Sequence, residues 1–377
     1  MPFKPQLVLI RTPKCLGVLH FRRPRLFLLQ PSRTSLCRAL IFTVLTVCLS
    51  SAALADRITM LDGKGRTVTG KILGISAEKI TVDVRGERQD IAANIIATTE
   101  FDGEPGALKT ARTAVTGSRM TEALEALDKV DPKTLTNDFL KQEAAYIRAW
   151  SKAKLVLAGS GNADDAEKEL SAFIKDHKNS YHFYEICELY GDLMVQQGKF
   201  DRAKSSYAAL AKAPWPEYSH KATVSLGMAE VSENKIDSAR KNFESVINAK
   251  SEGDDESDQT ERIKGMAKVG LALCLTAEKK YDEAIKELEK IAENSGSEDS
   301  IFQSLVYNSL GATFEKAGKP REAILAFMHT DILFSSARTE HIKALTELSK
   351  LWKQVKRVER AEAIENRLKD LYNISIK

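Results

Sequence analysis

The chain has 377 residues, 43% hydrophobic and 29% charged, a composition typical of soluble globular proteins that excludes a chain disordered throughout. Its formal net charge is +4. This excess is concentrated in residues 1–38, which hold no acidic residue and eight basic ones: Lys4, Arg11, Lys14, Arg22, Arg23, Arg25, Arg33 and Arg38. The positive charge therefore does not indicate nucleic-acid binding by the remainder of the chain, and no nucleic-acid partner is expected.

Residues 1–55 are predicted to be a basic leader and secretory signal peptide. An apolar run, Ala39–Leu49, follows the basic stretch and precedes a small-residue cleavage motif, Ala53–Leu54–Ala55. The run is too short to span a bilayer of about 30 Å as a helix. Cleavage before Asp56 would remove eight positive charges and change the formal net charge from +4 to −4. We expect an exported protein, located in the periplasm, the cell envelope or the extracellular space, with no membrane span in the mature chain.

Three features of the leader leave alternatives open. The basic region is longer than a signal peptide needs, so translation could start downstream of Met1. Arg22–Arg23 admits a twin-arginine signal, although Pro24 follows directly. Cys48 admits lipidation, although Val47 stands where a small residue is expected.

Residues 56–103 are predicted to form a small β-barrel-like domain. Their hydrophobic residues alternate with a period of two, and turn residues separate five short strands. The strands are expected at Ile58–Leu61, Thr67–Ile72, Ile80–Val84, around Ile91 and at Thr98–Phe101. Gly70 is expected to let the second strand bend. The strand count and hairpin spacing resemble an SH3-like or Sm-like barrel.

Residues 104–371 are predicted to be helical throughout, in repeated hairpins. In four units a small residue lies twelve positions before an alanine, and a large residue follows that alanine by four. The pairs are Gly191 with Ala203, Gly227 with Ala239, Ala272 with Ala284, and Gly311 with Ala323; the large residues are Tyr207, Phe243, Leu288 and Phe327. Glycine or alanine lets two helices approach, and the large residue fills the space beside them. The pattern resembles the tetratricopeptide repeat.

That resemblance implies a mainly α chain, a right-handed α-solenoid of tetratricopeptide-like hairpins preceded by the small all-β domain. Seven hairpins are expected over Gly106–Leu371, including weaker units at Gly106–Val130 and Asn137–His177, with residues 372–377 as a C-terminal tail. Asp or Pro is expected to start the second helix of the central units. An acidic insertion, Ser251–Glu261, separates the fourth unit from the fifth and is expected to be a solvated loop, since it lacks the residue order of a calcium loop.

Chemistry-bearing motifs are absent from residues 56–377. This part of the sequence holds no Walker loop, nucleophile elbow, zinc-protease motif or dinucleotide fingerprint, so we expect no enzyme activity and no cofactor. His177, His182 and Cys187 are poorly aligned for a metal site. Glu185, Glu188 and Asp192 share one predicted helix face and could serve acid–base chemistry, but such spacing is commoner in a solvated acidic stripe.

The tetratricopeptide resemblance implies a concave groove lined by the first helices of the hairpins. Six residues are then expected to contact a partner: Glu188, Asp192, Gln196, Val224, Met228 and Val231. These acidic and apolar positions depart from the Lys, Asn and Arg clamp with which the family holds a C-terminal carboxylate. A basic or apolar helix, or a loop of another protein, suits the groove better.

The leading hypothesis is an exported, non-enzymatic scaffold that binds a protein or peptide partner through its solenoid. Two alternatives remain. One is a self-assembling structural protein of the envelope that forms homo-oligomers through the β domain or the solenoid ends. The other is an accessory subunit of an envelope enzyme, with the β domain reading a ligand.

Overall fold

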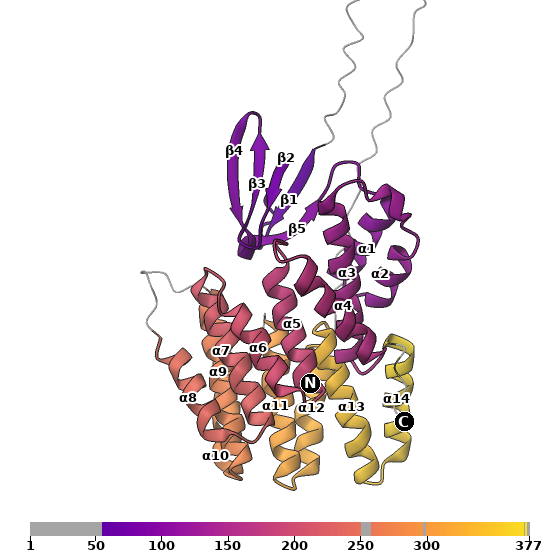
Figure 1. The fold of residues 1–377 in the computed structure, drawn as a ribbon. Helices are drawn as coiled ribbons and strands as arrows, with labels where there is room; N and C mark the ends of the chain where they lie inside the picture. Colours follow the sequence, from indigo (N-terminus) through magenta and orange to yellow (C-terminus); the bar gives the residue numbers. More distant parts are fainter. Residues whose placement is uncertain (1–54, 250–257, 297–298, 373, 375–377) are drawn as a thin grey trace, which may run out of the picture. The chain divides into compact units, whose positions relative to one another are not determined.

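The structure is a computed structural model that describes residues 55–249, 258–296, 299–372 and 374 (Figure 1). Of the expected leader, residues 1–54 lie outside the described residues. Most of the acidic insertion lies outside them as well, but its last four residues, 258–261, belong to a helix rather than to a loop. No helix in the described ranges is long and apolar enough to cross a membrane.

Five antiparallel strands form one sheet near the start of the described chain (Figure 1). Their bounds are β1 (Asp56–Met60), β2 (Thr67–Ile75), β3 (Lys79–Val84), β4 (Glu87–Ala92) and β5 (Ile96–Glu100), with a 3-10 turn, η1 (Ala93–Ile95), before β5. The strand order is β4-β3-β2-β1-β5, so that the first and last strands are neighbours. The five strands expected from the period-two pattern are thus confirmed.

Gly70 is required where β2 crosses β3. A Cβ placed on Gly70 would lie 2.3 Å from the carbonyl oxygen of Asp83, closer than any side chain tolerates. The pairing of β2 with β3 also shifts register between Ile72 and Gly74. A glycine and an irregular register together allow one strand to pair with β1 along its first half and with β3 along its second.

Within the described residues fourteen α-helices follow, and they pair in sequence order as seven hairpins. Their bounds are α1 (Gly106–Thr116), α2 (Met120–Leu127), α3 (Asp138–Leu157), α4 (Ala163–Asp176), α5 (Phe183–Gln196), α6 (Phe200–Leu210), α7 (Pro216–Ser232), α8 (Ile236–Ile247), α9 (Asp258–Ala277), α10 (Tyr281–Asn294), α11 (Ser300–Lys316), α12 (Pro320–Leu333), α13 (Arg338–Gln354) and α14 (Val358–Tyr372). A 3-10 turn, η2 (Pro132–Thr134), precedes α3. The expected seven-hairpin solenoid is confirmed. Ile374 is buried in a hydrophobic cluster with residues of α12, α13 and α14.

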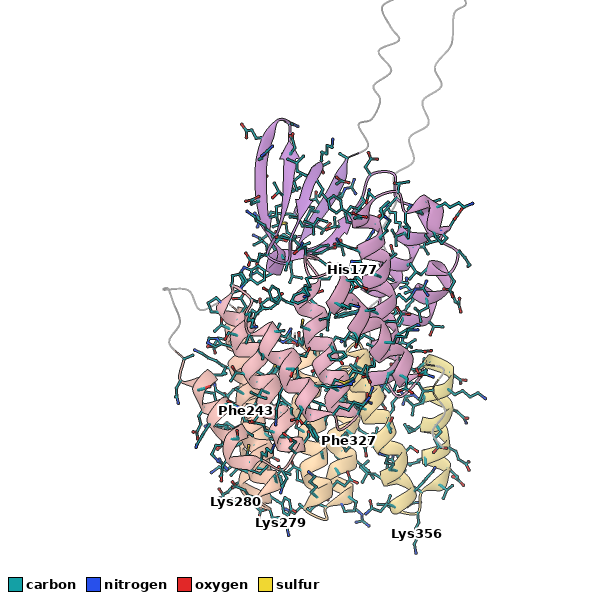
Figure 2. The ribbon with its side chains drawn as sticks, in the orientation of Figure 1. His177, Phe243, Lys279, Lys280, Phe327 and Lys356 are labelled. Atoms are coloured by element: carbon teal, nitrogen blue, oxygen red, sulfur yellow. The ribbon has the colours of Figure 1, made fainter. Side chains whose placement is uncertain are left out.

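The glycines of the first helices lie against the aromatic rings of the second helices. A Cβ on Gly191 would come within 2.3 Å of the Tyr207 ring, and one on Gly227 within 2.7 Å of the Phe243 ring. Phe243, labelled in Figure 2, also faces a glycine of the next hairpin: a Cβ on Gly270 would lie 2.4 Å from its ring. The small residue therefore provides the volume that the ring occupies, which explains their fixed spacing in the sequence.

The turns between paired helices share one backbone conformation that the sequence only partly signalled. A residue with positive φ follows the first helix; it is glycine at Gly198 and Gly318 but Ser118, Asn234, Lys279 and Lys356 in four other turns. The next residue caps the second helix without a side-chain hydrogen bond. The expectation that Asp starts the second helix is therefore wrong for three turns, where Asp201, Asp237 and Asp282 occupy the second helical position and complement the helix dipole instead.

One hydrophobic core runs from the sheet into the first helical hairpins. Ile58 and Ile80 of the sheet belong to the same cluster of buried residues as Leu108 of α1, Phe173 of α4 and Leu193 of α5. A hydrogen bond from Asn94 Nδ2 to Glu217 Oε1, 2.8 Å long, also joins η1 to the start of α7. The β domain is thus packed against the helices and is not a separate module on a flexible tether.

Candidate functional site

A large cavity among the described residues lies along the first helices of the hairpins. It has a volume of about 960 Å³ and is lined by residues of α1, α3, α5, α7, α9, α11 and α13, together with a few from β5, α6 and α14. First helices line the inner surface of a helical-repeat stack, because each hairpin places its second helix behind the first. This cavity is therefore the candidate binding site.

Five of the six residues predicted to contact a partner line this cavity. Glu188, Asp192 and Gln196 do so from α5, and Val224 and Met228 from α7. Val224 is 1% exposed, so its side chain belongs mainly to the core, whereas Met228 is half-buried and Gln196 is exposed.

The sixth residue lies elsewhere. Val231 does not line the cavity; it packs against the hydrophobic cluster that contains Ala239 and Phe243. Val231 lies one turn along α7 from Met228, on the side of the helix that faces α8.

The acidic side chains of α5 are paired and do not form the solvated stripe that their spacing favoured. Glu188 Oε2 lies 2.6 Å from Lys221 Nζ of α7. Asp192 Oδ1 accepts a 2.9 Å hydrogen bond from the Tyr207 hydroxyl of α6. Burial, with the nearby Glu188 carboxylate, raises the pKa of Asp192 to about 6. The Asp192 carboxyl group at the cavity wall therefore gains or loses its proton close to neutral pH.

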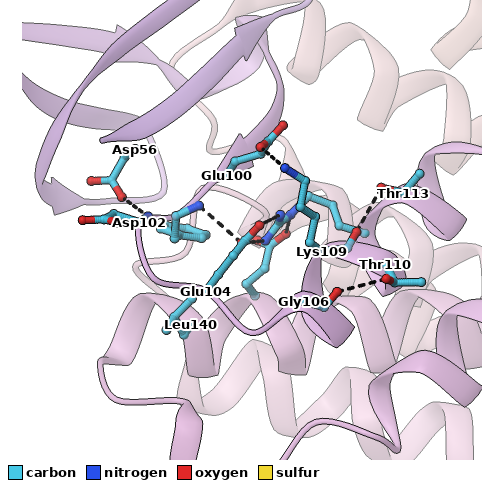
Figure 3. Close-up of polar contacts among 12 residues, drawn as sticks. Asp56, Glu100, Asp102, Glu104, Gly106, Lys109, Thr110, Thr113 and Leu140 are labelled. Carbon is cyan, nitrogen blue, oxygen red and sulfur yellow. Dashed lines mark hydrogen bonds and ion pairs between the residues drawn. The ribbon is translucent and has the colours of Figure 1, made fainter. Parts of the chain in front are cut away.

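A buried ion-pair network that the sequence did not reveal ties the linker after the sheet to α1 and α3. The Arg112 guanidinium donates to both carboxylate oxygens of Glu104, at 2.8 and 2.7 Å, and to Glu143 Oε1 at 2.7 Å. Figure 3 shows the neighbouring contacts of this linker: the Asp102 amide donates to Asp56 Oδ1, and Lys109 pairs with Glu100. Nothing in the local sequence pattern signals these pairs, because Arg112 and Glu143 are 31 positions apart.

The network continues into α5 through His182. Its Nε2 lies 3.3 Å from Glu143 Oε2 and its Nδ1 lies 3.1 Å from Glu185 Oε2. The imidazole is stacked on the Tyr146 ring, with 3.4 Å between centroids and 2° between planes. The hydroxyl groups of Tyr146 and Tyr181 donate to Glu185 and Glu143 respectively. Two carboxylates and two phenol rings therefore surround one histidine.

Charge complementarity inside the network outweighs the cost of burial. Burial alone would raise the pKa of Glu143, but the Arg112 guanidinium and His182 lower it to about 2. Burial alone would lower the pKa of His182, but the hydrogen bonds to Glu143 and Glu185 raise it. Burial, reinforced by neighbouring carboxylates, raises the pKa values of Tyr146 and Tyr181 well above the usual range. The network thus favours the protonated form of the His182 imidazole between two carboxylates.

The His177, His182 and Cys187 set does not come together. His177 packs its ring near Phe173, and the backbone carbonyl of Cys187 accepts a hydrogen bond from the Ser206 hydroxyl. Within the described ranges, no three His, Cys, Asp or Glu side chains gather as metal ligands would. The thiols of Cys187 and Cys274 are free and buried, and burial raises their pKa values to about 12 and about 11.

A second histidine was also missed by the sequence reasoning. His341 of α13 is 1% exposed and places Nε2 2.8 Å from Asp331 Oδ1, while its Nδ1 lies beside the Tyr372 hydroxyl. Arg367 of α14 donates to both oxygens of the same Asp331. These contacts fasten the last hairpin to α12, and Tyr372 in turn lines the far end of the cavity.

Part of the remaining cavity wall is apolar, although the cationic Lys154, Arg338 and Lys343 line the cavity as well. The apolar lining residues are Met266 of α9, Ile301 and Leu305 of α11 and Ile342 of α13. They contrast with the acidic residues that α5 contributes to the cavity. Ile301 is 56% exposed, so an apolar side chain is available there to a ligand. Chemically, the cavity can hold a chain segment that presents cationic groups to α5 and hydrophobic groups to α9 and α11.

Comparisons with known proteins agree with the repeat pattern. Residues 210–331, from the end of α6 to α12, match the family described as tetratricopeptide repeat-like domain. No curated protein matches the sequence.

Several solved structures are similar to the chain. They include a Rap protein complexed with competence and sporulation factor (12% identity, 70% of this chain and 74% of the other, TM-score 0.44) and the apo form of RapI (11%, 72% and 77%, TM-score 0.39). A third is MamA from AMB-1 (19%, 51% and 93%, TM-score 0.27). The repeat pattern expected from the sequence is thus matched by a known family over the central hairpins, and residues 210–331 form a tetratricopeptide repeat-like domain.

Proposed function

We propose that the protein is an exported, non-enzymatic scaffold that binds a segment of a protein partner in the cavity along α5, α7, α9 and α11. The observation that carries this proposal is the chemistry of the cavity wall, acidic on α5 at Glu188 and Asp192 and apolar at Met228, Ile301 and Leu305. A volume of about 960 Å³ accommodates several side chains of an inserted segment.

The expected ligand is an extended or helical segment with basic and apolar side chains. A Lys or Arg side chain would approach Asp192, whose carboxyl group loses its proton near neutral pH and gains a stronger attraction for a cation when it does. Apolar side chains of the ligand would cover Met228 and Ile301. The Arg112–Glu143–His182 network would act by holding α1, α3 and α5 in place, since its charges are already paired within the protein.

Affinity capture from an envelope fraction tests this proposal. The bait is the chain from Asp56, compared with Ile301→Asp and with Val358→Asp. The two residues are similarly exposed, at 56% and 53%, but only Ile301 lines the cavity. We expect a partner retained by the parent chain and by Val358→Asp and lost with Ile301→Asp. A partner retained equally by all three would place recognition outside the cavity.

Deleting the β domain would be a poor test of the same point. Ile58 and Ile80 share a core with Leu108, so a truncated chain would expose hydrophobic residues of α1 and bind unrelated proteins. Point substitutions at exposed positions avoid this problem.

Export has its own test, which does not depend on the partner. We expect the full-length chain, expressed in a bacterial host, to be recovered outside the cytoplasm with Asp56 as its first residue, as determined by N-terminal sequencing. Recovery of uncleaved chain from the cytoplasm would contradict export while leaving the binding proposal intact.

A further inference from the structure

A second groove, separate from the cavity, lies between α10 and α12. It has a volume of about 340 Å³, and none of its lining residues lines the large cavity. Its floor is apolar, formed by Tyr307, Leu310 and Phe314 of α11, with Ala292 and Ala326 from the flanking helices. Tyr307 is held in place by stacking against His329, with 4.5 Å between the ring centroids.

An apolar stripe on α12 continues this groove. Leu325, Ile332 and Leu333 are 61%, 64% and 61% exposed, and exposed apolar side chains that gather in one patch mark an interaction surface. With His329 between them, they fall at successive turns of one helix, over a length of about 12 Å. Two turns of a partner helix would match this length.

The charged rim of the groove is acidic. Glu289 and Glu293 of α10 and Glu322 of α12 line it, and no Lys or Arg does so among the described residues. In the part of the chain that the structure describes, these three carboxylates have no ion-pair partner, whereas Glu278, Asp282 and Asp299 in the same two hairpins are paired. Three unpaired carboxylates around an apolar floor attract a partner of opposite charge and repel an anionic membrane surface.

We propose that this groove docks an amphipathic basic helix of a partner protein. The apolar face of that helix, with large aliphatic residues at positions i, i+4 and i+7, would cover Leu325 and the Tyr307–Phe314 floor. Its Lys or Arg residues would flank the apolar face and pair with Glu289, Glu293 and Glu322. This surface goes beyond the proposed cavity function and gives the scaffold a second, chemically distinct binding face.

Fluorescence anisotropy with a labelled synthetic probe tests the docking site. The probe is an 18-residue helical peptide made of Leu and Lys, in which Leu repeats at positions i, i+4 and i+7 so that one face is apolar. A control peptide, its acidic twin, carries Glu in place of every Lys. We expect the basic probe to bind the parent chain at least about tenfold more tightly than the acidic twin, and more weakly as salt is raised.

Variants locate the binding. Leu325→Asp is expected to weaken binding of the basic probe at least about tenfold, because the probe would bury Leu325 in the complex. Leu325 is exposed in the free chain, so the change should not affect folding. The double variant Glu289→Lys with Glu293→Lys should weaken it about three- to tenfold and improve binding of the acidic twin. Glu287→Lys, a single charge reversal on α10 outside the groove, should leave binding unchanged.

The remaining outcomes overturn the proposal. Equal binding of the two twins, or no effect of Leu325→Asp, would exclude a basic helix at this groove. Loss of binding with Ile301→Asp alone would show that the probe enters the large cavity instead. Dimerisation of the parent chain in sedimentation experiments, abolished by Leu325→Asp, would mean that a second copy covers the stripe.

Discussion

The α-carbon of Gly311 on α11 faces the ring of Phe327 on α12 so closely that a Cβ on Gly311 would lie 2.7 Å from the ring. Real Cβ atoms do not approach aromatic carbons to this distance, and the Phe327 ring is almost fully buried (Figure 2). The same relationship joins Gly191 to Tyr207 and Gly227 to Phe243. A single methyl group at any of these positions must therefore separate two helices or displace a buried ring.

Gly311→Ala should destabilise the protein by about 1 to 3 kcal/mol through overpacking, measured as the free energy of unfolding in urea. Gly106→Ala is the matched control, because Gly106 is also helical but has no atom within 4 Å of its Cβ position. It should be neutral or slightly stabilising. Combining Gly311→Ala with Phe327→Leu should cost less than the sum of the two single changes. Strict additivity would argue against the contact.

Arg112→Met should cost about 3 to 5 kcal/mol of stability, because it removes the guanidinium from two buried carboxylates, those of Glu104 and Glu143. The measurement is again urea unfolding, followed by circular dichroism. Arg119→Met is the control: its ion pair with Glu122 is exposed, so its loss should cost at most about 1 kcal/mol. Similar losses for the two variants would contradict the assigned role of the network.

Asp192→Asn should stabilise the protein at pH 7.5, and the gain should shrink as the pH is lowered to 5. The pKa of Asp192 is raised to about 6, above its ordinary value of 3.8, so the folded protein holds this proton more tightly than the unfolded chain. Its ionised form is therefore penalised above pH 6, and stability is regained as the pH falls through that value. A stability difference that does not vary between pH 5 and 7.5 would show that Asp192 is ordinarily solvated.

His182→Gln should lose more stability at pH 6 than at pH 9. Hydrogen bonds to Glu143 and Glu185 raise the pKa of His182 above its ordinary value of 6.5. The stabilisation is therefore complete below that ordinary value and is lost as the pH rises through the folded-state pKa. His329→Gln is the control, since that exposed ring pairs with no carboxylate among the described residues. Direct titration of the His182 ring protons by NMR checks the direction of the shift.

Lys279→Gly should stabilise the protein by up to about 1 kcal/mol, because Lys279 has φ of +65°, where a side chain is strained and glycine is not. Lys280→Gly at the adjacent cap, with φ of −82°, should be neutral or destabilising. Both residues lie in the turn between α9 and α10 (Figure 2). Thermal unfolding of the pair of variants decides the point: stabilisation by both, or by neither, would contradict the strained turn.

Local sequence was sufficient for elements whose residues interact over one or two helical turns. Gly311, Ala323 and Phe327 are close in sequence, so the hairpin contact could be read from their spacing. The turn at Lys279 was not foreseen as left-handed, since lysine carries no preference for that conformation. The tetratricopeptide resemblance places Val231 in the groove, but only the packed structure shows that Met228 lines the cavity and Val231 does not.

The sequence by itself determined the seven hairpins, the five strands and the acidic and apolar character of the α5 and α7 faces, since periodicity and small-to-large spacing act within single hairpins. Only the tertiary structure decided which charges are paired. Arg112 reaches Glu143 and His182 reaches Glu143 across more than thirty positions, and such pairs form only when successive hairpins stack. The stacking also set the shape of the cavity and the exposure of Leu325, because curvature accumulates from small rotations between repeats that no single repeat encodes.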